Sequence, residues 1–186
     1  MASDRDFEAV LAAARRGDGG ALAELYRAVY PRIVRYLRAK EPGEAEDLAT
    51  DTWLDVVHGL EGFRGDESDL RAFSFTIARR RLLDLQRRRS RRRTETREPR
   101  GLIEAGPIGN VEEEALSSLG AGWAIDLITS SLTSDQADVV LLRVIGDLEV
   151  DAVAKIVGKR PGTVRVLHHR ALRRLATILQ REGVTR

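Results

Sequence analysis

Residues 148–172 of the 186-residue chain read LEVDAVAKIVGKRPGTVRVLHHRAL, and this stretch decides how the C-terminal part of the chain folds. Apolar residues at helical spacing run up to Gly158, and Pro161 opens a second helical segment. Glycine takes the positive φ that a tight turn needs, and a proline at the first helical position has no backbone donor to lose. The pattern is typical of a helix-turn-helix, in which the small Ala154 lies where two helices cross and Val164 fills the angle between them.

The second helix of this motif is strongly basic. Arginine makes bidentate contacts to guanine or phosphate, and the N-terminus of a helix favours negative charge. We therefore expect this helix to lie in the major groove of DNA, with a solvated basic helix as the alternative. Its basic residues are Lys159, Arg160, Arg165, Arg170, Arg173 and Arg174.

The formal net charge of +2 hides a pattern of charged blocks. Residues 1–62 hold 8 basic and 12 acidic side chains (−4), and residues 63–100 hold 13 and 6 (+7). Residues 101–140 hold 0 and 7 (−7), and residues 141–186 hold 10 and 4 (+6). Two cationic segments on either side of an acidic one indicate two contacts with a polyanion, although solvated arginine-rich faces are the simpler alternative.

The apolar periodicity is helical along the whole chain, and no window shows the alternation of a strand, so the expected fold is all-α. Pro31 falls inside an expected helix and predicts either a kink near Tyr30 or two abutting helices. Ser68 or Asp69 is expected to cap the fourth helix, whose distal arginine run is expected to fray into solvent. The expected N-terminal helices span residues 4–16, 21–40, 44–58 and 70–89.

Composition divides the chain into two small helical domains. Residues 1–95 are expected to form a helical bundle, and residues 123–186 a helix-turn-helix domain. Prolines and glycines mark residues 96–122 as a flexible acidic linker with at most one short helix. In the second domain a helix is expected over residues 123–131, and Thr133 to Gln136 has the form of a capping box for the next one.

The composition leaves little room for catalytic or metal chemistry. The chain has no Cys and only three His, and it contains neither a glycine-rich phosphate loop nor a His-Glu-x-x-His motif. We therefore expect no enzyme activity, no cofactor and no metal site, and packing or phosphate contact for His168 and His169. No apolar run approaches the roughly 20 residues that span a bilayer, and the N-terminus lacks the order of a signal peptide, so we expect a soluble, cytoplasmic protein.

Three segments together resemble a known family. Residues 44–53, EAEDLATDTW, are similar to the acidic AEDLVQETF segment with which that family's first domain binds the polymerase clamp. Residues 62–66 and 71–79, GFRGD and RAFSFTIAR, resemble the loop and helix that recognise and open the −10 element. Residues 162–171 resemble the GTVKSRLHRA helix that reads the −35 element. The chain thus resembles the extracytoplasmic-function (ECF) group of bacterial RNA polymerase sigma factors.

The resemblance implies a function and a set of contacts. It implies an alternative sigma factor whose region 2-like domain is residues 1–95 and whose region 4-like domain is residues 123–186. The implied partners are core RNA polymerase, through its β′ clamp and β flap, promoter DNA and an inhibitory anti-sigma factor. The implied −35 contacts are Arg160, Thr163, Arg165, His169, Arg170 and Arg173. The implied −10 contacts are Phe63, Arg64, Phe75, Arg79, Arg80 and Arg87. The implied polymerase contacts are Glu46, Asp47, Asp51 and Asp55.

The sequence departs from the family pattern at two places that bear on base choice. Arg80 stands where the family commonly has an asparagine implicated in −10 base choice, and Val166-Leu167 stands where the −35 helix usually has Ser-Arg. Apolar groups can still meet thymine methyl groups, so the −35 preference is left open while DNA binding is expected.

Two other functions fit the residues less well. A helix-turn-helix regulator that acts without polymerase would bind its operator alone, commonly as a dimer on palindromic sites, but the sequence has no obvious dimerisation helix. An adaptor that binds only protein would make both basic blocks incidental.

Overall fold

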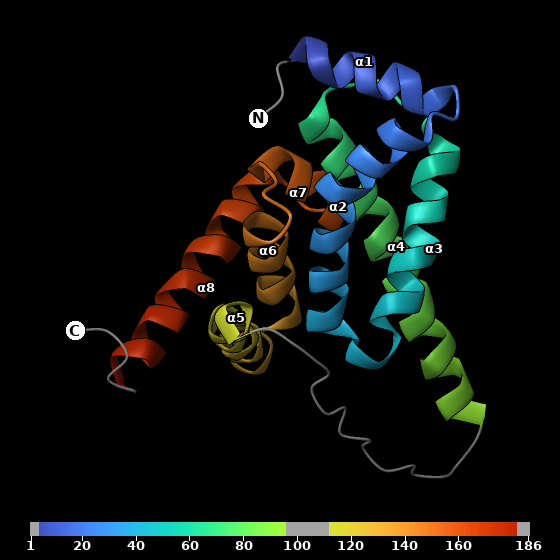
Figure 1. Ribbon diagram of the computed structural model, residues 1–186. Helices are drawn as coiled ribbons and strands as arrows, with labels where there is room; N and C mark the ends of the chain where they lie inside the picture. The colour runs from blue at the N-terminus through green and yellow to red at the C-terminus, as the bar shows by residue number, and fades with distance from the viewer. Residues whose placement is uncertain (1–3, 96–111, 182–186) are drawn as a thin grey trace. The chain divides into compact units, whose positions relative to one another are not determined.

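The computed structural model describes residues 4–95 and 112–181 of the chain (Figure 1). Every regular element in these two ranges is helical, which confirms the expected all-α fold. The chain divides into two compact units, Met1–Leu102 and Ile103–Arg186. Residues 96–111 of the expected linker lie outside the described residues.

The first unit is built around α2, whose apolar stripe contacts both α3 and α4. Asp18 begins this helix, because its Oδ1 accepts a hydrogen bond from the backbone N–H of Ala21 at 2.8 Å. Tyr36 and Phe75 are fully buried at the centre, with their rings edge to face and their centroids 5.5 Å apart. The elements are α1 (Asp4–Arg15), α2 (Gly19–Lys40), the 3-10 helix η1 (Pro42–Glu44), α3 (Ala45–Gly59) and α4 (Glu67–Glu95).

Pro31 does not divide α2, so of the two expected alternatives, a kink near Tyr30 or two abutting helices, the second is excluded. The ring of Pro31 lies on the exposed side of the helix, while Val29 and Ile33 on either side of it are fully buried. The hydrogen bond that proline cannot make is therefore missing on the side that faces water, where water can replace it.

The start of α4 is capped by Asp66 and not by Ser68 or Asp69. Asp66 Oδ1 accepts a hydrogen bond from the backbone N–H of Asp69 at 2.8 Å, and Asp69 Oδ2 accepts one from the backbone N–H of Asp66 at 3.2 Å. This reciprocal pair is the capping-box arrangement with two aspartates. Gly65 precedes it with a φ of 141°, and a Cβ there would lie 2.5 Å from the Cβ of Asp69.

The distal arginine run of α4 is helical to Glu95, so the expectation that it frays is wrong. Its anchor is Arg89, which donates to Glu41 Oε2 at 2.6 Å and to Glu44 Oε1 at 2.8 Å. Both carboxylates lie at the corner between α2 and α3, and Gln86 also donates to Glu41, at 3.2 Å. The part of α4 around Gln86 and Arg89 is thus tied to a corner that precedes it by more than forty residues.

The second unit contains the helix-turn-helix. The first helix of the second unit, α5, begins at Glu112 and not at Trp123. Gly120 and Gly122 lie inside it, because a glycine costs a helix only about 1 kcal/mol and does not by itself end it. The capping box of Thr133 and Gln136 is confirmed. The elements are α5 (Glu112–Ser131), α6 (Ser134–Val144), α7 (Val150–Val157) and α8 (Pro161–Arg181).

The packing of α8 confirms the roles that the sequence predicts for the motif. Gly158 has a φ of 67° in the turn, Ala154 is buried on α7, and Val164 and Ala171 on α8 are fully buried. Helix α8 contacts both α6 and α7, and Ala171 joins a core cluster with residues of α6 and of the α5–α6 turn.

The turn gives a testable prediction at Gly158. Substitution Gly158→Ala costs about 1 kcal/mol in the free energy of unfolding, because a side chain at positive φ is strained. No atom lies within 4 Å of a Cβ built there, so a clash adds nothing to this cost. Thermal denaturation followed by circular dichroism measures the loss. The matched control is Gly162→Ala, which is inside α8 with equally open space and is expected to be neutral or slightly stabilising. Equal losses in the two variants would contradict the explanation.

Candidate nucleic-acid interface

Helix α8 presents one continuous exposed face. Val164 and Ala171 mark its buried side. An α-helix has 3.6 residues per turn, so the side opposite these two residues carries a second series of residues that are three or four positions apart. All of these opposite residues are exposed. They are Gly162, Val166, His169 and Arg173, with Arg165 and Arg170 as exposed flanks.

The arginines of this face have no acidic partner within the described residues. Arg165, Arg170 and Arg173 form no ion pair with any acidic group in the described part of the chain, and neither does Arg160 just before the helix. Lys159 differs, because its Nζ lies 2.8 Å from Asp135 Oδ2 on α6. The structure thus brings all six residues predicted for −35 contact to the exposed side of one helix or to its start. Lys159 is not among the basic residues without an acidic partner.

The loop between α6 and α7 is held by Arg143. Its Nη1 donates to the carbonyl oxygen of Leu148 at 2.5 Å and lies 3.3 Å from Glu149 Oε2. Asp147 in this loop has a φ of 51°, a left-handed conformation that aspartate tolerates better than most residues. These contacts fix where α7 begins and therefore how α8 is presented.

The two adjacent histidines of α8 have different surroundings. His168 is half-buried, and burial lowers its pKa below the ordinary value, with the nearby charge of Arg143 as a second cause. It is therefore a neutral packing residue at pH 7. His169 is exposed on the same face as Val166.

In the first unit, two predicted −10 contacts prove to be core residues. Phe75 is fully buried, and Phe63 is buried against Phe73 with ring centroids 5.6 Å apart. Neither ring is available to a nucleic acid in this structure, so we correct both assignments. The sequence could not separate them from surface aromatics because a large apolar residue fits either role. Arg64 is exposed, and its Nη1 donates to the carbonyl oxygens of Phe63 and Glu61.

Three of the arginines predicted for −10 contact lie on α4, and two of these are close to acidic groups. Arg79 is half-buried and Arg80 is exposed, with Arg80 Nη2 3.5 Å from Asp55 Oδ2. Arg87 is exposed and lies 3.4 Å from Asp84 Oδ1 on its own helix. Basic side chains on this helix are thus partly neutralised, unlike those of α8.

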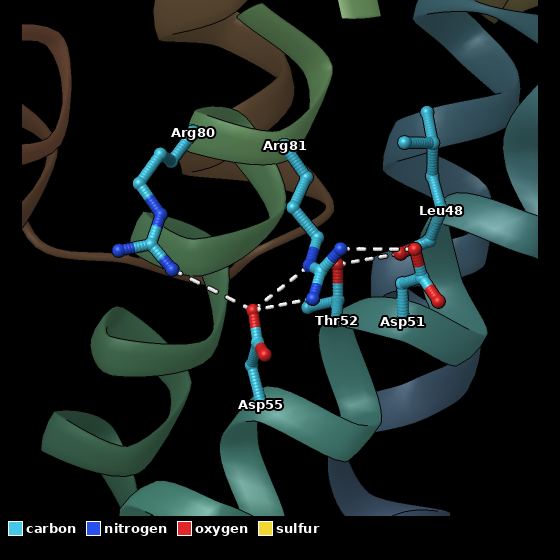
Figure 2. Close-up of polar contacts among 6 residues, drawn as sticks. All are labelled: Leu48, Asp51, Thr52, Asp55, Arg80 and Arg81. Carbon is cyan, nitrogen blue, oxygen red and sulfur yellow. Dashed lines mark hydrogen bonds and ion pairs between the residues drawn. The ribbon is translucent and has the colours of Figure 1, made fainter. Parts of the chain in front are cut away.

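Arg81 links α4 to the acidic side of α3, as Figure 2 shows. Its Nε donates to Asp55 Oδ2 at 2.8 Å and its Nη1 to Asp51 Oδ2 at 2.9 Å. The hydrogen bond from Arg81 lowers the pKa of Asp55 although burial opposes it, and the same bond raises the pKa of Arg81. Sequence reasoning missed Arg81, because helical periodicity does not show which charges meet across two helices.

The acidic side of α3 is therefore only partly free. Asp51 and Asp55 hold Arg81, and Glu46 pairs with Arg38 of α2. Of the four residues predicted for polymerase contact, Asp47 alone forms no ion pair within the described residues.

An exposed apolar group accompanies this acidic side, and sequence reasoning missed it as well. Leu54 is 51% exposed on α3. Trp53, the residue before it, meets Tyr26 edge to face with ring centroids 5.2 Å apart, and Tyr26 stacks on Tyr30 at 4.3 Å. The signal was available, since Leu54 stands off the apolar stripe of α3 and beside the aspartates. Contiguous apolar patches rimmed by polar residues mark protein-binding surfaces, whereas single exposed apolar residues are common on any surface.

Two absences concern the described ranges 4–95 and 112–181 alone. No group of three or more His, Asp or Glu side chains in them could hold a metal ion. No helix in them has the length and the apolar character that crossing a membrane requires.

The contact between Asp55 and Arg81 gives a prediction for stability. Asp55→Asn lowers the free energy of unfolding by about 0.5 to 1 kcal/mol at pH 7, because the pair is partly exposed. The folded pKa of Asp55 is below the unfolded value, so this stabilisation is present above about pH 4 and is lost as the pH falls further. Urea unfolding at pH 7 and at a pH below about 4 measures the loss. Trp53 fluorescence is the signal, in a Trp123→Phe background.

The matched control for this prediction is Asp47→Asn, the same change on the same helix at a residue without an ion pair. We expect it to lower the free energy of unfolding by less than Asp55→Asn does, because Asp47 lies in the first turn of α3 and loses only the favourable interaction of its charge with the helix N-terminus. Similar losses for Asp47→Asn and Asp55→Asn would show that the contact with Arg81 contributes nothing.

His168 gives a second prediction in which stability is lost as the pH falls, here in a higher pH range. Because its folded pKa is lowered, the unfolded chain binds a proton more readily, and the second unit loses stability as the pH falls below about 6.5. His168→Gln is expected to reduce this loss between about pH 7.5 and 5.5. Urea unfolding followed by Trp123 fluorescence in a Trp53→Phe background measures it. The exposed neighbour His169→Gln is the control, and an equal reduction there would refute the assignment.

Comparison with known proteins places this geometry in context. The family model described as Sigma-70 region 2 matches residues 25–92, and the one described as Sigma-70, region 4 matches residues 123–175. The chain is 34% identical over 173 residues to "ECF RNA polymerase sigma factor ShbA" of Streptomyces griseus subsp. griseus, covering 88% of this chain and 90% of that protein. It is 33% identical over 178 residues to "ECF RNA polymerase sigma factor SigD" of Mycobacterium tuberculosis, covering 91% of this chain and 82% of that protein.

A solved structure has a similar fold. It is the sigma factor RpoE of Bartonella quintana, solved in complex with the anti-sigma factor NepR. The TM-score is 0.62 at 21% identity, and the match covers 85% of this chain and 96% of that one.

Proposed function

We propose a division of contacts between the two units of this chain, which belongs to the ECF RNA polymerase sigma factors. As a member of that family it is an alternative sigma factor, which binds core RNA polymerase and promoter DNA and directs transcription initiation. The family consists of initiation factors that are not enzymes, and we assign no catalytic activity to this chain. We place it in the cytoplasm, where the polymerase acts.

Recognition of the −35 element is assigned to the exposed face of α8. The observation that carries this assignment is the set of guanidinium groups of Arg165, Arg170 and Arg173, which point away from the buried side and have no acidic partner within the described residues. Charges left free on one side of a helix attract phosphates on both walls of the major groove. Arg160, Thr163 and His169 complete the contact surface.

The −10 element is assigned to α4 and the loop before it. Arg64, Arg79, Arg80 and Arg87 supply the cationic groups, while Phe63 and Phe75 support them from the core. Because Arg80 already lies against Asp55, its contribution depends on the acidic side of α3.

The polymerase is assigned to that acidic side. Asp47 is its free charge and Leu54 its exposed apolar group, with Glu46, Asp51 and Asp55 around them. We place the β′ clamp here and the β flap on the second unit. The proposed domains are residues 1–95 and 123–186, and both family-model matches fall inside them. The proposed linker is residues 96–122, of which the part from Glu112 onward is the first part of α5.

An inhibitory partner completes the proposal. We propose an anti-sigma factor that covers the polymerase-binding surface of the first unit. Support comes from the exposed Leu54, from the aromatic group of Tyr26, Tyr30 and Trp53, and from the similarly folded RpoE, which was solved with the anti-sigma factor NepR.

Run-off transcription with core polymerase tests the function. The wild-type chain is expected to give core enzyme a promoter preference that core enzyme alone lacks. Arg165→Ala combined with Arg170→Ala is expected to reduce transcription about tenfold or more, because two phosphate or base contacts are lost. The control is Arg181→Ala at the far end of the same helix, which is expected to change little.

The salt dependence of DNA binding by the full chain gives a second readout. About five neutralised phosphates correspond to a log–log slope near −4 to −5, and the double variant should reduce this slope by about 2. A slope near zero, or a wild-type chain that confers no promoter preference, would remove the assignment.

A further inference from the structure

An apolar side chain stands at the centre of the basic face of α8. Val166 is 48% exposed, whereas Val164 in the same helix and Val153 in the preceding one are fully buried. Its position on the helix is opposite the buried side, so it does not support the packing of the motif.

The surroundings of Val166 make this apolar spot accessible to a close partner. Gly162 lies one turn earlier on the same face, and a Cβ built there meets no atom within 4 Å. The first turn of α8 therefore presents bare backbone beside an isopropyl group. Exposed arginines flank it on both sides, Arg165 on one and Arg170 on the other.

This arrangement favours one kind of partner. The free charges on both flanks complement a polyanion, and phosphates contacted from both sides would bring the centre of the face against base edges. The apolar group that base pairs present in the major groove is the C5-methyl group of thymine. An apolar protein partner would instead leave the flanking arginines without acidic groups to contact.

We propose that Val166 reads the C5-methyl group of a thymine in the upstream promoter element, with Gly162 providing the room for close approach. This inference rests on the proposed function of α8 and adds a base class to it. Burial of one methyl group corresponds to about a fourfold change in affinity. Val166 thus acts as a specificity-determining residue, while the arginines supply affinity common to all sequences.

The test uses holoenzyme reconstituted from core polymerase and the full chain. Holoenzyme selects from promoters with a randomised upstream element, and each thymine of the selected element is then replaced in turn by deoxyuridine, which lacks only the methyl group. We expect one or two positions at which this replacement weakens wild-type binding about fourfold. Val166→Ala is expected to bind the thymine and deoxyuridine versions equally.

Val144→Ala is the matched control, since Val144 is a 65% exposed valine on a different helix, and it is expected to keep the sensitivity to deoxyuridine. Thermal denaturation of Val166→Ala shows whether the variant is folded, which its exposure favours. An enriched element without sensitivity to deoxyuridine, or the same sensitivity in Val166→Ala, would overturn the inference while leaving the proposed function intact. If holoenzyme enriches no upstream element, both are overturned.

Discussion

The burial of Val164 and Ala171 against α6 and α7 determines everything that α8 can present. Two small or β-branched side chains allow the helix to pack closely, and the positive φ of Gly158 sets the direction from which it arrives. With the buried side thus defined, helical geometry alone places Val166 and Arg173 outward. The exposed face of α8, to which we assign the −35 element, is therefore a consequence of the core of the second unit.

The arginines of the two units differ in whether they form ion pairs within the described residues. On α8 the guanidinium groups are left without acidic partners in the described part of the chain, which costs some stability through repulsion but leaves them ready for phosphate. On α4, Arg81 and Arg89 hold carboxylates of preceding elements and so contribute to the fold. Free charges suit contact with a polyanion, whereas paired charges suit alignment of helices.

Local signals in the sequence predicted local structure well. Gly158, Pro161 and the capping box of Thr133 each act within a few residues, and each is found where it was expected. The features that the sequence predicted wrongly involve distant partners: Arg89 of α4 contacts Glu41 and Glu44, and Phe75 packs against Tyr36. Likewise, the surface position of the α8 arginines follows from one helical period, but the contact of Asp55 with Arg81 requires knowing which helices are neighbours.

The contact of Arg81 with Asp51 and Asp55 also affects how strongly these two aspartates bind a cation of another molecule. Such a cation exchanges one ion pair for another, so the net gain in free energy is a difference between two similar quantities. Affinity at this surface therefore grows slowly with the number of contacts. A surface of this kind favours reversible association. This suits a subunit that binds the polymerase for only part of the transcription cycle.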